Sequence, residues 1–134
     1  MQDHRKLRVW KQAHELAVAV RSATREFPPA GYASLQGQMV RAAESIVFNI
    51  AEGCGSTSQR EFARFLGIGI KSSFELEAQC ELAKDYAVLG PPAWQELSTA
   101  VIDVRRMLFG LRKKVLLSPH SKRMDNADRA AANG

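Results

Sequence analysis

The sequence predicts an all-α protein, an up-down-up-down antiparallel four-helix bundle with a disordered C-terminal tail. Apolar residues recur at steps of three and four along four long segments, which is the period of an amphipathic helix. Clusters of proline and glycine separate these segments and leave only short connections, as between antiparallel neighbours in a bundle. A chain of 134 residues without an internal repeat is one domain by length.

The first two predicted helices cover residues 3–27 and about 34–52. Pro28-Pro29 ends the first, because proline lacks an amide hydrogen and disfavours helical conformation in the residue before it. Gly53 and Gly55 are the expected stop of the second, since glycine tolerates the left-handed conformation that often follows a helix. The second helix has small residues on its apolar face, so we expect it to pack closely inside the bundle.

The third predicted helix starts at about Gln59. Ser58-Gln59-Arg60-Glu61 fits the capping box, in which the serine hydroxyl and the glutamate carboxylate each bind an unpaired amide of the first turn. Gly67 and Gly69 inside this helix each cost up to about 1 kcal/mol relative to alanine. We therefore expect another backbone to approach closely there.

The fourth predicted helix spans residues 92–117 and starts in a proline pair, which suits a first helical turn. Its apolar residues alternate steps of three and four over three heptads, a pattern typical of bundle helices. The predicted bundle therefore covers residues 1–117. Residues 118–134 have no periodicity and form the predicted disordered tail.

Positive charge is concentrated at the two ends of the chain. The formal net charge is +5. Residues 1–26 carry six Lys and Arg against three Asp and Glu, and residues 90–134 carry eight against four. This asymmetry favours an anionic partner, although a solvated basic face that binds nothing specific explains the charge equally well.

The candidate nucleic-acid-binding residues are cations of these two segments: Arg5, Lys6, Arg8, Lys11, Arg105, Arg106, Arg112, Lys113 and Lys114. Phosphate binding needs cations that converge on a backbone, and it weakens with salt because it depends on counterion release. Few exposed aromatic residues are expected beside them, which argues against base stacking. We expect non-sequence-specific contact with RNA or DNA.

The sequence contains no recognisable catalytic constellation. The Glu-x-x-His spacing of di-iron bundles, a phosphate-binding glycine loop and a Cys-His motif are all missing. The carboxylates that could be grouped as a site are Glu44, Glu52, Glu75 and Glu77. Salt bridges to Arg41 or Arg64 are a simpler role for them than catalysis. We therefore expect no enzymatic activity, no metal and no cofactor.

The sequence also predicts a cytoplasmic protein without membrane contact. No apolar run reaches the ~18 residues of a membrane span. The charged N-terminus lacks the apolar stretch of a signal peptide. In this setting Cys54 and Cys80 are expected to be reduced thiols.

The chain has more apolar residues than four helix faces need: Phe48, Ile68, Phe74, Leu82, Ile102 and Phe109. A second apolar surface favours self-association. The alternative is a well-packed monomer whose apolar faces are wide.

The segment 38–53 fits the long pattern Q-x-x-R-A-x-x-S-I-x-x-N-I-A-E-G. The matching residues are Gln38, Arg41, Ala42, Ser45, Ile46, Asn49, Ile50, Ala51, Glu52 and Gly53. Residues 9–13 (V-W-K-Q-A), 61–66 (E-F-A-R-F-L) and 73–77 (S-F-E-L-E) are similar to further elements of the same family, with Ser72 in place of its usual glycine. In these residues the chain resembles the four-helix-bundle proteins encoded in intervening sequences of 23S rRNA genes.

This resemblance implies more than the periodicity does. Family members assemble as homopentamers. Related accessory variability determinant proteins accompany reverse transcriptases in diversity-generating retroelements, where a basic pentamer binds nucleic acid and the polymerase. No catalytic residues are known for the family. The structural or interface candidates are the matched polar residues and one apolar residue: Gln38, Arg41, Asn49, Glu52, Glu75 and Phe48.

Two functions remain open. The first is a non-enzymatic homo-oligomer, pentameric by resemblance, that binds RNA or DNA through a basic surface as an accessory factor. The second is a protein-interaction scaffold, for example for a reverse transcriptase, that does not bind nucleic acid directly.

Overall fold

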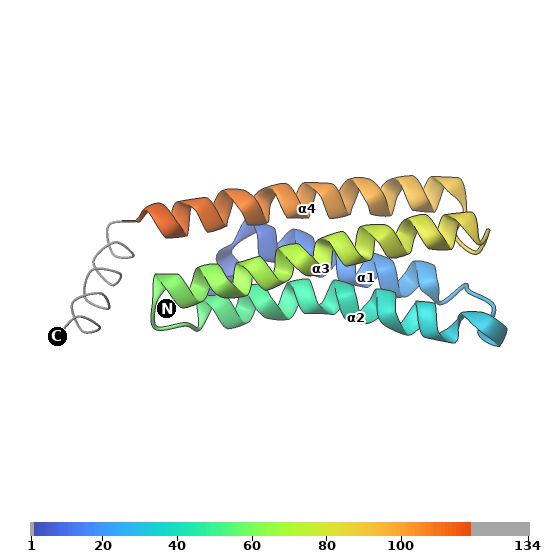
Figure 1. Cartoon of the computed structure of the whole chain (residues 1–134), viewed down its shortest axis with the longest axis horizontal. Helices are drawn as coiled ribbons and strands as arrows, with labels where there is room; N and C mark the ends of the chain where they lie inside the picture. The colour runs from blue at the N-terminus through green and yellow to red at the C-terminus, as the bar shows by residue number, and fades with distance from the viewer. Residues whose placement is uncertain (1, 119–134) are drawn as a thin grey trace, which may run out of the picture.

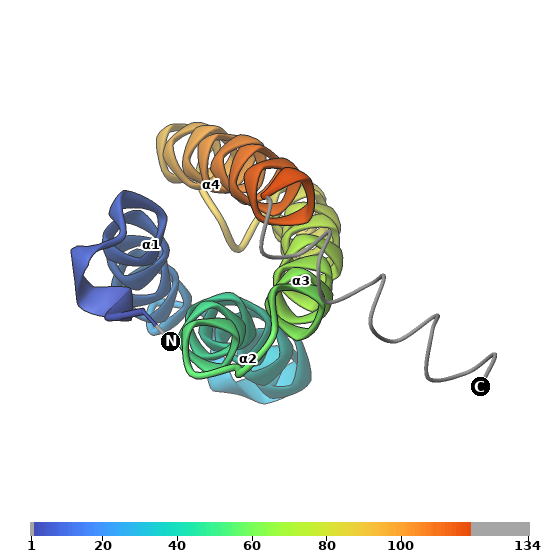
Figure 2. The same cartoon turned by 90° about the vertical axis from the view of Figure 1, so that its left-hand side faces the viewer.

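The computed structural model describes residues 2–118 and consists of four long helices (Figure 1). They are α1 (Arg8–Thr24), α2 (Pro29–Cys54), α3 (Gln59–Asp85) and α4 (Pro91–Leu117), preceded by the 3-10 turn η1 (His4–Lys6). Consecutive helices run antiparallel, and the end-on view in Figure 2 shows them arranged in chain order around one core. The predicted all-α four-helix bundle is confirmed. Apart from Ser118, which caps α4, the predicted tail lies outside the described residues.

The first helix is shorter than the predicted segment 3–27. The Asp3 carboxylate accepts the Arg5 amide at 3.0 Å and caps η1. Leu7 is then extended, and α1 begins only at Arg8. The prediction of one continuous helix from Asp3 was wrong. The Asp3 cap forms the first turn as a separate 3-10 helix, and Leu7 separates this turn from α1. At the other end α1 stops at Thr24, before the two prolines.

The second helix begins at Pro29, earlier than predicted, but with a kink. Ala30 and Gly31 leave helical conformation, and Gly31 has a φ of +89°. An L side chain rarely adopts that conformation, so glycine is the suitable residue at this point of the turn. The proline-rich connection therefore redirects the chain before α2 proceeds.

The predicted glycine stop of α2 is confirmed in its place but not in its conformation. The helix ends at Cys54 with Gly55 as its C-cap, and Gly55 has a φ of −81°, in the right-handed region and not the left-handed one. Gly53 is buried, and a Cβ atom there would lie 2.7 Å from Cδ1 of Phe62 on α3. This glycine therefore allows α2 and α3 to approach closely.

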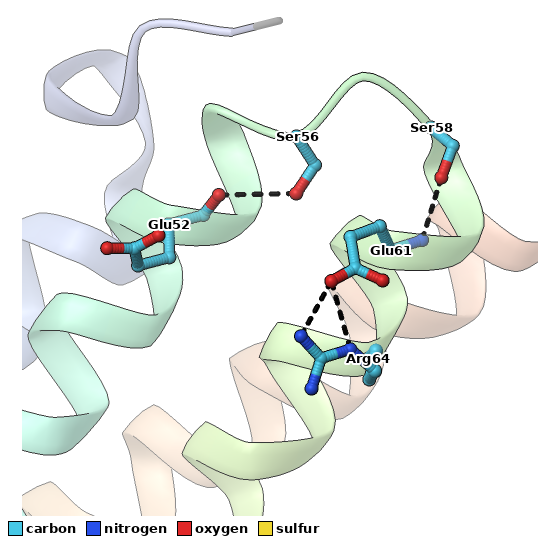
Figure 3. Close-up of polar contacts among 5 residues, drawn as sticks. All are labelled: Glu52, Ser56, Ser58, Glu61 and Arg64. Atoms are coloured by element: carbon cyan, nitrogen blue, oxygen red, sulfur yellow. Dashed lines mark hydrogen bonds and ion pairs between the residues drawn. The ribbon is translucent and has the colours of Figure 1, made fainter.

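The α2–α3 corner shows half of the predicted capping box (Figure 3). The Ser58 hydroxyl accepts the Glu61 amide at 3.1 Å, so the predicted N-cap and the start of α3 at Gln59 are confirmed. The Glu61 carboxylate instead accepts Arg64 Nη2 at 2.6 Å. The predicted bond from the Glu61 carboxylate back to the Ser58 amide does not form, because Arg64, one turn further along α3, binds that carboxylate instead.

The glycines inside α3 face side chains, not another backbone as expected. The nearest atom to a Cβ on Gly67 would be Arg112 Nε at 3.6 Å, and for Gly69 it would be Leu108 Cδ1 at 3.7 Å. Both are ordinary contact distances, and both partners belong to α4. These two glycines therefore make room for side chains of the fourth helix.

All four helices contribute to one apolar core. The largest fully buried side chains include Met39, Ile46, Ile50, Leu66, Leu76 and Leu108. Cys54 and Cys80 are buried free thiols, as expected. Burial raises the pKa of the Cys80 thiol from 9.0 to about 12, and it also raises the pKa of Cys54. Neither thiol is suited to nucleophilic chemistry near neutral pH, because the reactive thiolate is disfavoured.

Candidate nucleic-acid interface

Most cations of the two predicted basic clusters lie at the same end of the bundle, whereas Arg105 and Arg106 lie near the middle of α4. The amide of Gln2 donates to the carbonyl of Cys54 at 2.9 Å, which fixes the N-terminal segment beside the last turn of α2. Arg112 Nε donates to the carbonyl of Ala63 at 3.1 Å, which places the C-terminal half of α4 beside the first turns of α3. Cations from the two ends of the chain therefore gather at the end that carries the α2–α3 corner (Figure 1).

The cations of the N-terminal cluster are exposed. Arg5 pairs with Asp3 at 3.1 Å, and the Arg5 guanidinium holds the pKa of that carboxyl below its usual value. Lys6, Arg8 and Lys11 make no ion pair with any described residue. These three are consequently the members of this cluster that are free to meet an anion.

The cations of α4 divide into two groups. Arg105 is mostly buried, with 13% of its side chain exposed, and its Nη2 donates to both carboxylate oxygens of Glu77. Its guanidinium also lies over the Phe74 ring, 4.1 Å from the centroid. Arg112 is committed to the carbonyl of Ala63. These two arginines support the packing of α4 on α3.

The remaining predicted cations of α4 are Arg106, Lys113 and Lys114. All three are exposed, and none makes an ion pair within residues 2–118. The exposed cations of this cluster therefore number three, and not five as the sequence pattern indicated.

Salt bridges expected within the bundle form with different partners. Glu77 pairs with Arg105 across the α3–α4 interface, and Arg64 pairs with its own-helix neighbour Glu61. The expectation that Arg41 or Arg64 would pair with Glu77 was wrong, because the cation that reaches it comes from α4. Arg41 is exposed and has no carboxylate partner in the described chain.

Ser45 of the motif makes a polar contact between two helices, because its hydroxyl lies 2.8 Å from the hydroxyl of Ser72 on α3. Within α2, Asn49 Nδ2 donates to the carbonyl of Ser45 at 2.7 Å. Ser72 stands where the family usually has glycine, and its hydroxyl links α3 to α2. This cluster satisfies polar groups that would otherwise cost about 1–3 kcal/mol each when buried.

The other polar candidates lie on the surface. Gln38 donates to the Ser34 hydroxyl at 3.2 Å, and Glu75 accepts the Gln79 amide at 3.2 Å. The Glu52 side chain is exposed. At the α2–α3 corner only the backbone carbonyl of Glu52 takes part in a hydrogen bond, which it accepts from the Ser56 hydroxyl at 3.2 Å (Figure 3). A role for these side chains at an interface stays a prediction.

Two apolar patches are exposed. The α1–α2 patch contains Val18 and Phe48, which are 59% and 61% exposed and line a shallow pocket between the two helices. The α3–α4 patch contains Phe74, Phe109 and Leu116. The end-on view shows that the pair α1 and α2 lies opposite the pair α3 and α4 (Figure 2). The bundle therefore presents two unlike apolar surfaces on opposite sides.

Sequence reasoning missed two cations of the first helix. Arg21 and Arg25 lie with Arg41 along an open groove between the end of α1 and the first half of α2. Their spacing of four residues, with no acidic residue one turn away on α1, was an available signal. Arg41 was identified only as a structural candidate.

Within the described range, no group of three or more His, Cys, Asp or Glu side chains could hold a metal ion. None of the helices in that range is both long and apolar enough to cross a membrane. The features that distinguish the molecular surface are therefore its cations and its apolar patches.

Together these features define a small, basic, all-α bundle protein. The chain belongs to the 23S rRNA-intervening sequence protein family, whose sequence profile matches residues 5–110. It is also similar to the crystal structure of a protein of unknown function of the S23 ribosomal protein family from Bacteroides thetaiotaomicron. That structure has a TM-score of 0.74 and 21% identity, and the match covers 78% of this chain and 98% of that one. The likeness shows the shared fold. No curated protein matches the chain.

Proposed function

We propose that this protein is a non-enzymatic, homo-oligomeric accessory factor that binds nucleic acid through a basic surface. The observation that carries the proposal is the gathering of unpaired cations from both ends of the chain at one end of the bundle. They are Lys6, Arg8, Lys11, Lys113 and Lys114, and the unpaired Arg106 lies further along α4, near its middle. Such an arrangement suits phosphates of a backbone, which carry no sequence information. Arg105 and Arg112 are left out because α3 engages them.

Self-association is supported by the two apolar patches. Because the patches differ and lie on opposite sides, pairing one with the other joins subunits head to tail. Repetition of such a contact gives either a closed ring or an open filament. The family resemblance favours a ring of five in the cytoplasm. A ring would also repeat the basic end around one axis and multiply its contacts with a polyanion.

The binding experiment uses a labelled structured RNA and a matched DNA duplex at several salt concentrations. The variant Arg106→Gln/Lys113→Gln/Lys114→Gln removes the exposed α4 cations. Three lost phosphate contacts should lower the slope of log affinity against log salt by roughly 2–3, with at least a tenfold loss of affinity at low salt.

The matched control is Lys71→Gln/Lys84→Glu, which removes the same three charges from the part of α3 that lies away from the α2–α3 corner. It should keep nearly all of the affinity. Equal losses in the two variants would mean that net charge alone matters, and would reject this surface. A light-scattering mass near the 14.8 kDa of one chain would reject the oligomer.

The exposed apolar patches also favour the second candidate, a protein-interaction scaffold, for example for a reverse transcriptase. A pull-down separates the two candidates. One stable protein partner that survives nuclease treatment supports the scaffold, whereas loss of every partner with nuclease supports nucleic-acid binding.

A further inference from the structure

An open groove of about 470 Å³ lies between the end of α1 and the first half of α2. Three arginines line it: Arg21 and Arg25 from α1, and Arg41 from α2. We call it the three-arginine groove. No carboxylate lines it, and the amide side chain of Gln36 is its other long polar group. The groove therefore brings together three positive charges and no negative charge.

The α1 arginines are aligned by helical spacing. Arg21 lies in the last turn of α1, and Arg25 is the residue that caps its C-terminus. Four residues apart, the two side chains share one face of the helix. The negative end of the α1 dipole favours cations at this position, which accounts for their presence there but not for Arg41.

The third arginine is accommodated by a glycine. Gly37 lies one turn before Arg41 on α2, and a Cβ atom on Gly37 would lie 3.1 Å from Arg41 Nη1. The guanidinium thus lies over the bare backbone of Gly37, at the wall of the groove. Glycine inside a helix costs up to about 1 kcal/mol relative to alanine. At this position the glycine leaves room for a cation.

The three guanidinium groups differ from Arg5, Arg64 and Arg105 in having no carboxylate partner within residues 2–118. Arg5, Arg64 and Arg105 each pair with a carboxylate. In contrast, none of the groove arginines makes an ion pair or a side-chain hydrogen bond within residues 2–118. Three like charges along one groove repel one another, and a bound anion relieves that repulsion. Guanidinium groups bind phosphate oxygens with two parallel hydrogen bonds, which suits them to this ligand class.

We propose that the three-arginine groove is a phosphate-binding site for the backbone of a polynucleotide. The proposal rests on the proposed nucleic-acid binding and adds a second contact region to it. No aromatic residue lines the groove, so it offers no surface on which bases stack. The expected contacts are therefore to phosphates, independent of sequence.

The groove is separate from the basic end of the bundle. Gly37 lies in the first half of α2, whereas the N-terminal segment is fixed beside Cys54 at the end of the same helix. With a rise of 1.5 Å per residue, these two points are about 25 Å apart. One nucleic acid of moderate length can span both regions, so removal of either should weaken binding only partly.

The test compares wild-type protein with Arg21→Gln/Arg25→Gln/Arg41→Gln by fluorescence anisotropy on a labelled 20-nucleotide RNA. The α3 variant Lys71→Gln/Lys84→Glu, which removes the same three charges, is the control for net charge. The groove variant should bind at least tenfold more weakly at low salt, with a salt slope smaller by about 2 for a single strand. The control should stay within threefold of wild type. If the groove variant matches the control in affinity and slope, the proposal is overturned.

A second measurement decides the site if wild-type protein binds neither RNA nor duplex. In that case the proposed function fails, and inorganic pyrophosphate is titrated while the arginine Nε–Hε signals are followed by NMR. Saturable shifts that are lost in the groove variant would keep the phosphate site and reject a polynucleotide as its ligand. Absence of shifts would overturn the site itself. Circular dichroism of the variant confirms that the helices remain.

Discussion

The α2–α3 interface is close and uncharged, whereas the α3–α4 interface contains two arginine side chains. Between α2 and α3, Gly53 lies directly against the ring and the backbone carbonyl of Phe62, so α2 contributes no side chain to the contact there. The hydroxyls of Ser45 and Ser72 meet further along at 2.8 Å. Small residues and a neutral hydrogen bond therefore hold this pair of helices together.

Between α3 and α4, longer side chains span the interface. Arg105 binds Glu77 and lies over the ring of Phe74, and Arg112 reaches the carbonyl of Ala63. These two arginines come from the segment that carries the C-terminal excess of charge. The contrast with α2–α3 teaches that a cation counted in a sequence can be engaged in contacts between helices. The charge available to a ligand is then smaller than the count along the chain, and it lies on the exposed side chains that remain unpaired.

The largest effect that tests this contrast is expected at Gly53. In Gly53→Ala, the new methyl group must displace the Phe62 ring, and overpacking of this kind costs about 2 kcal/mol of unfolding free energy. Denaturant unfolding at one fixed protein concentration measures it. Gly55→Ala is the control, because a Cβ there meets Glu52 O at an ordinary 3.5 Å, and its effect should be within about 0.5 kcal/mol. Equal effects would show that α2 and α3 are not closely packed at this point.

An intermediate effect is expected at Arg105. Arg105→Gln leaves the Glu77 carboxylate, 28% exposed, without its cation, and should cost about 1–2 kcal/mol of unfolding free energy. The matched variant Arg64→Gln breaks an exposed pair and should cost less than about 0.5 kcal/mol. In RNA binding the two variants should be alike, because neither side chain is free to meet phosphate. A selective loss of RNA affinity in Arg105→Gln would restore Arg105 to the nucleic-acid surface.

The fold was predictable because its core follows a local rule. Apolar spacing of three and four residues locates all four helices, and the family motif agrees with it. The errors occurred where a local pattern depends on a distant partner. Gly53 looked like a helix stop, but its role is set by Phe62, which belongs to the next helix. Glu61 fits a capping box, but Arg64 competes for its carboxylate.

The candidate surface was less predictable for the same reason. The positions of the basic clusters follow from the sequence, but their pairing does not. The partners of Arg105 and Arg112 lie 28 and 49 residues away along the chain. The three-arginine groove likewise depends on how α1 lies against α2, which no spacing within one helix reveals. Charge can be counted along a chain, whereas its availability is a property of packed helices.

The smallest effect is expected at the serine pair of α2–α3. Ser72→Ala removes the hydroxyl that meets Ser45, and a net hydrogen bond of this kind contributes about 1 kcal/mol to the unfolding free energy. Ser98 provides the matched control, because its hydroxyl oxygen is buried on α4 without a hydrogen-bond partner among the described residues. Ser98→Ala removes an unsatisfied polar atom and should leave stability unchanged or raise it. If denaturant unfolding shows a lower unfolding free energy for Ser72→Ala and an unchanged or higher one for Ser98→Ala, the neutral hydrogen bond contributes to the contact between α2 and α3. If both variants lost the same stability, the Ser45–Ser72 contact would contribute nothing specific, and the close approach at Gly53 would have to hold that interface alone.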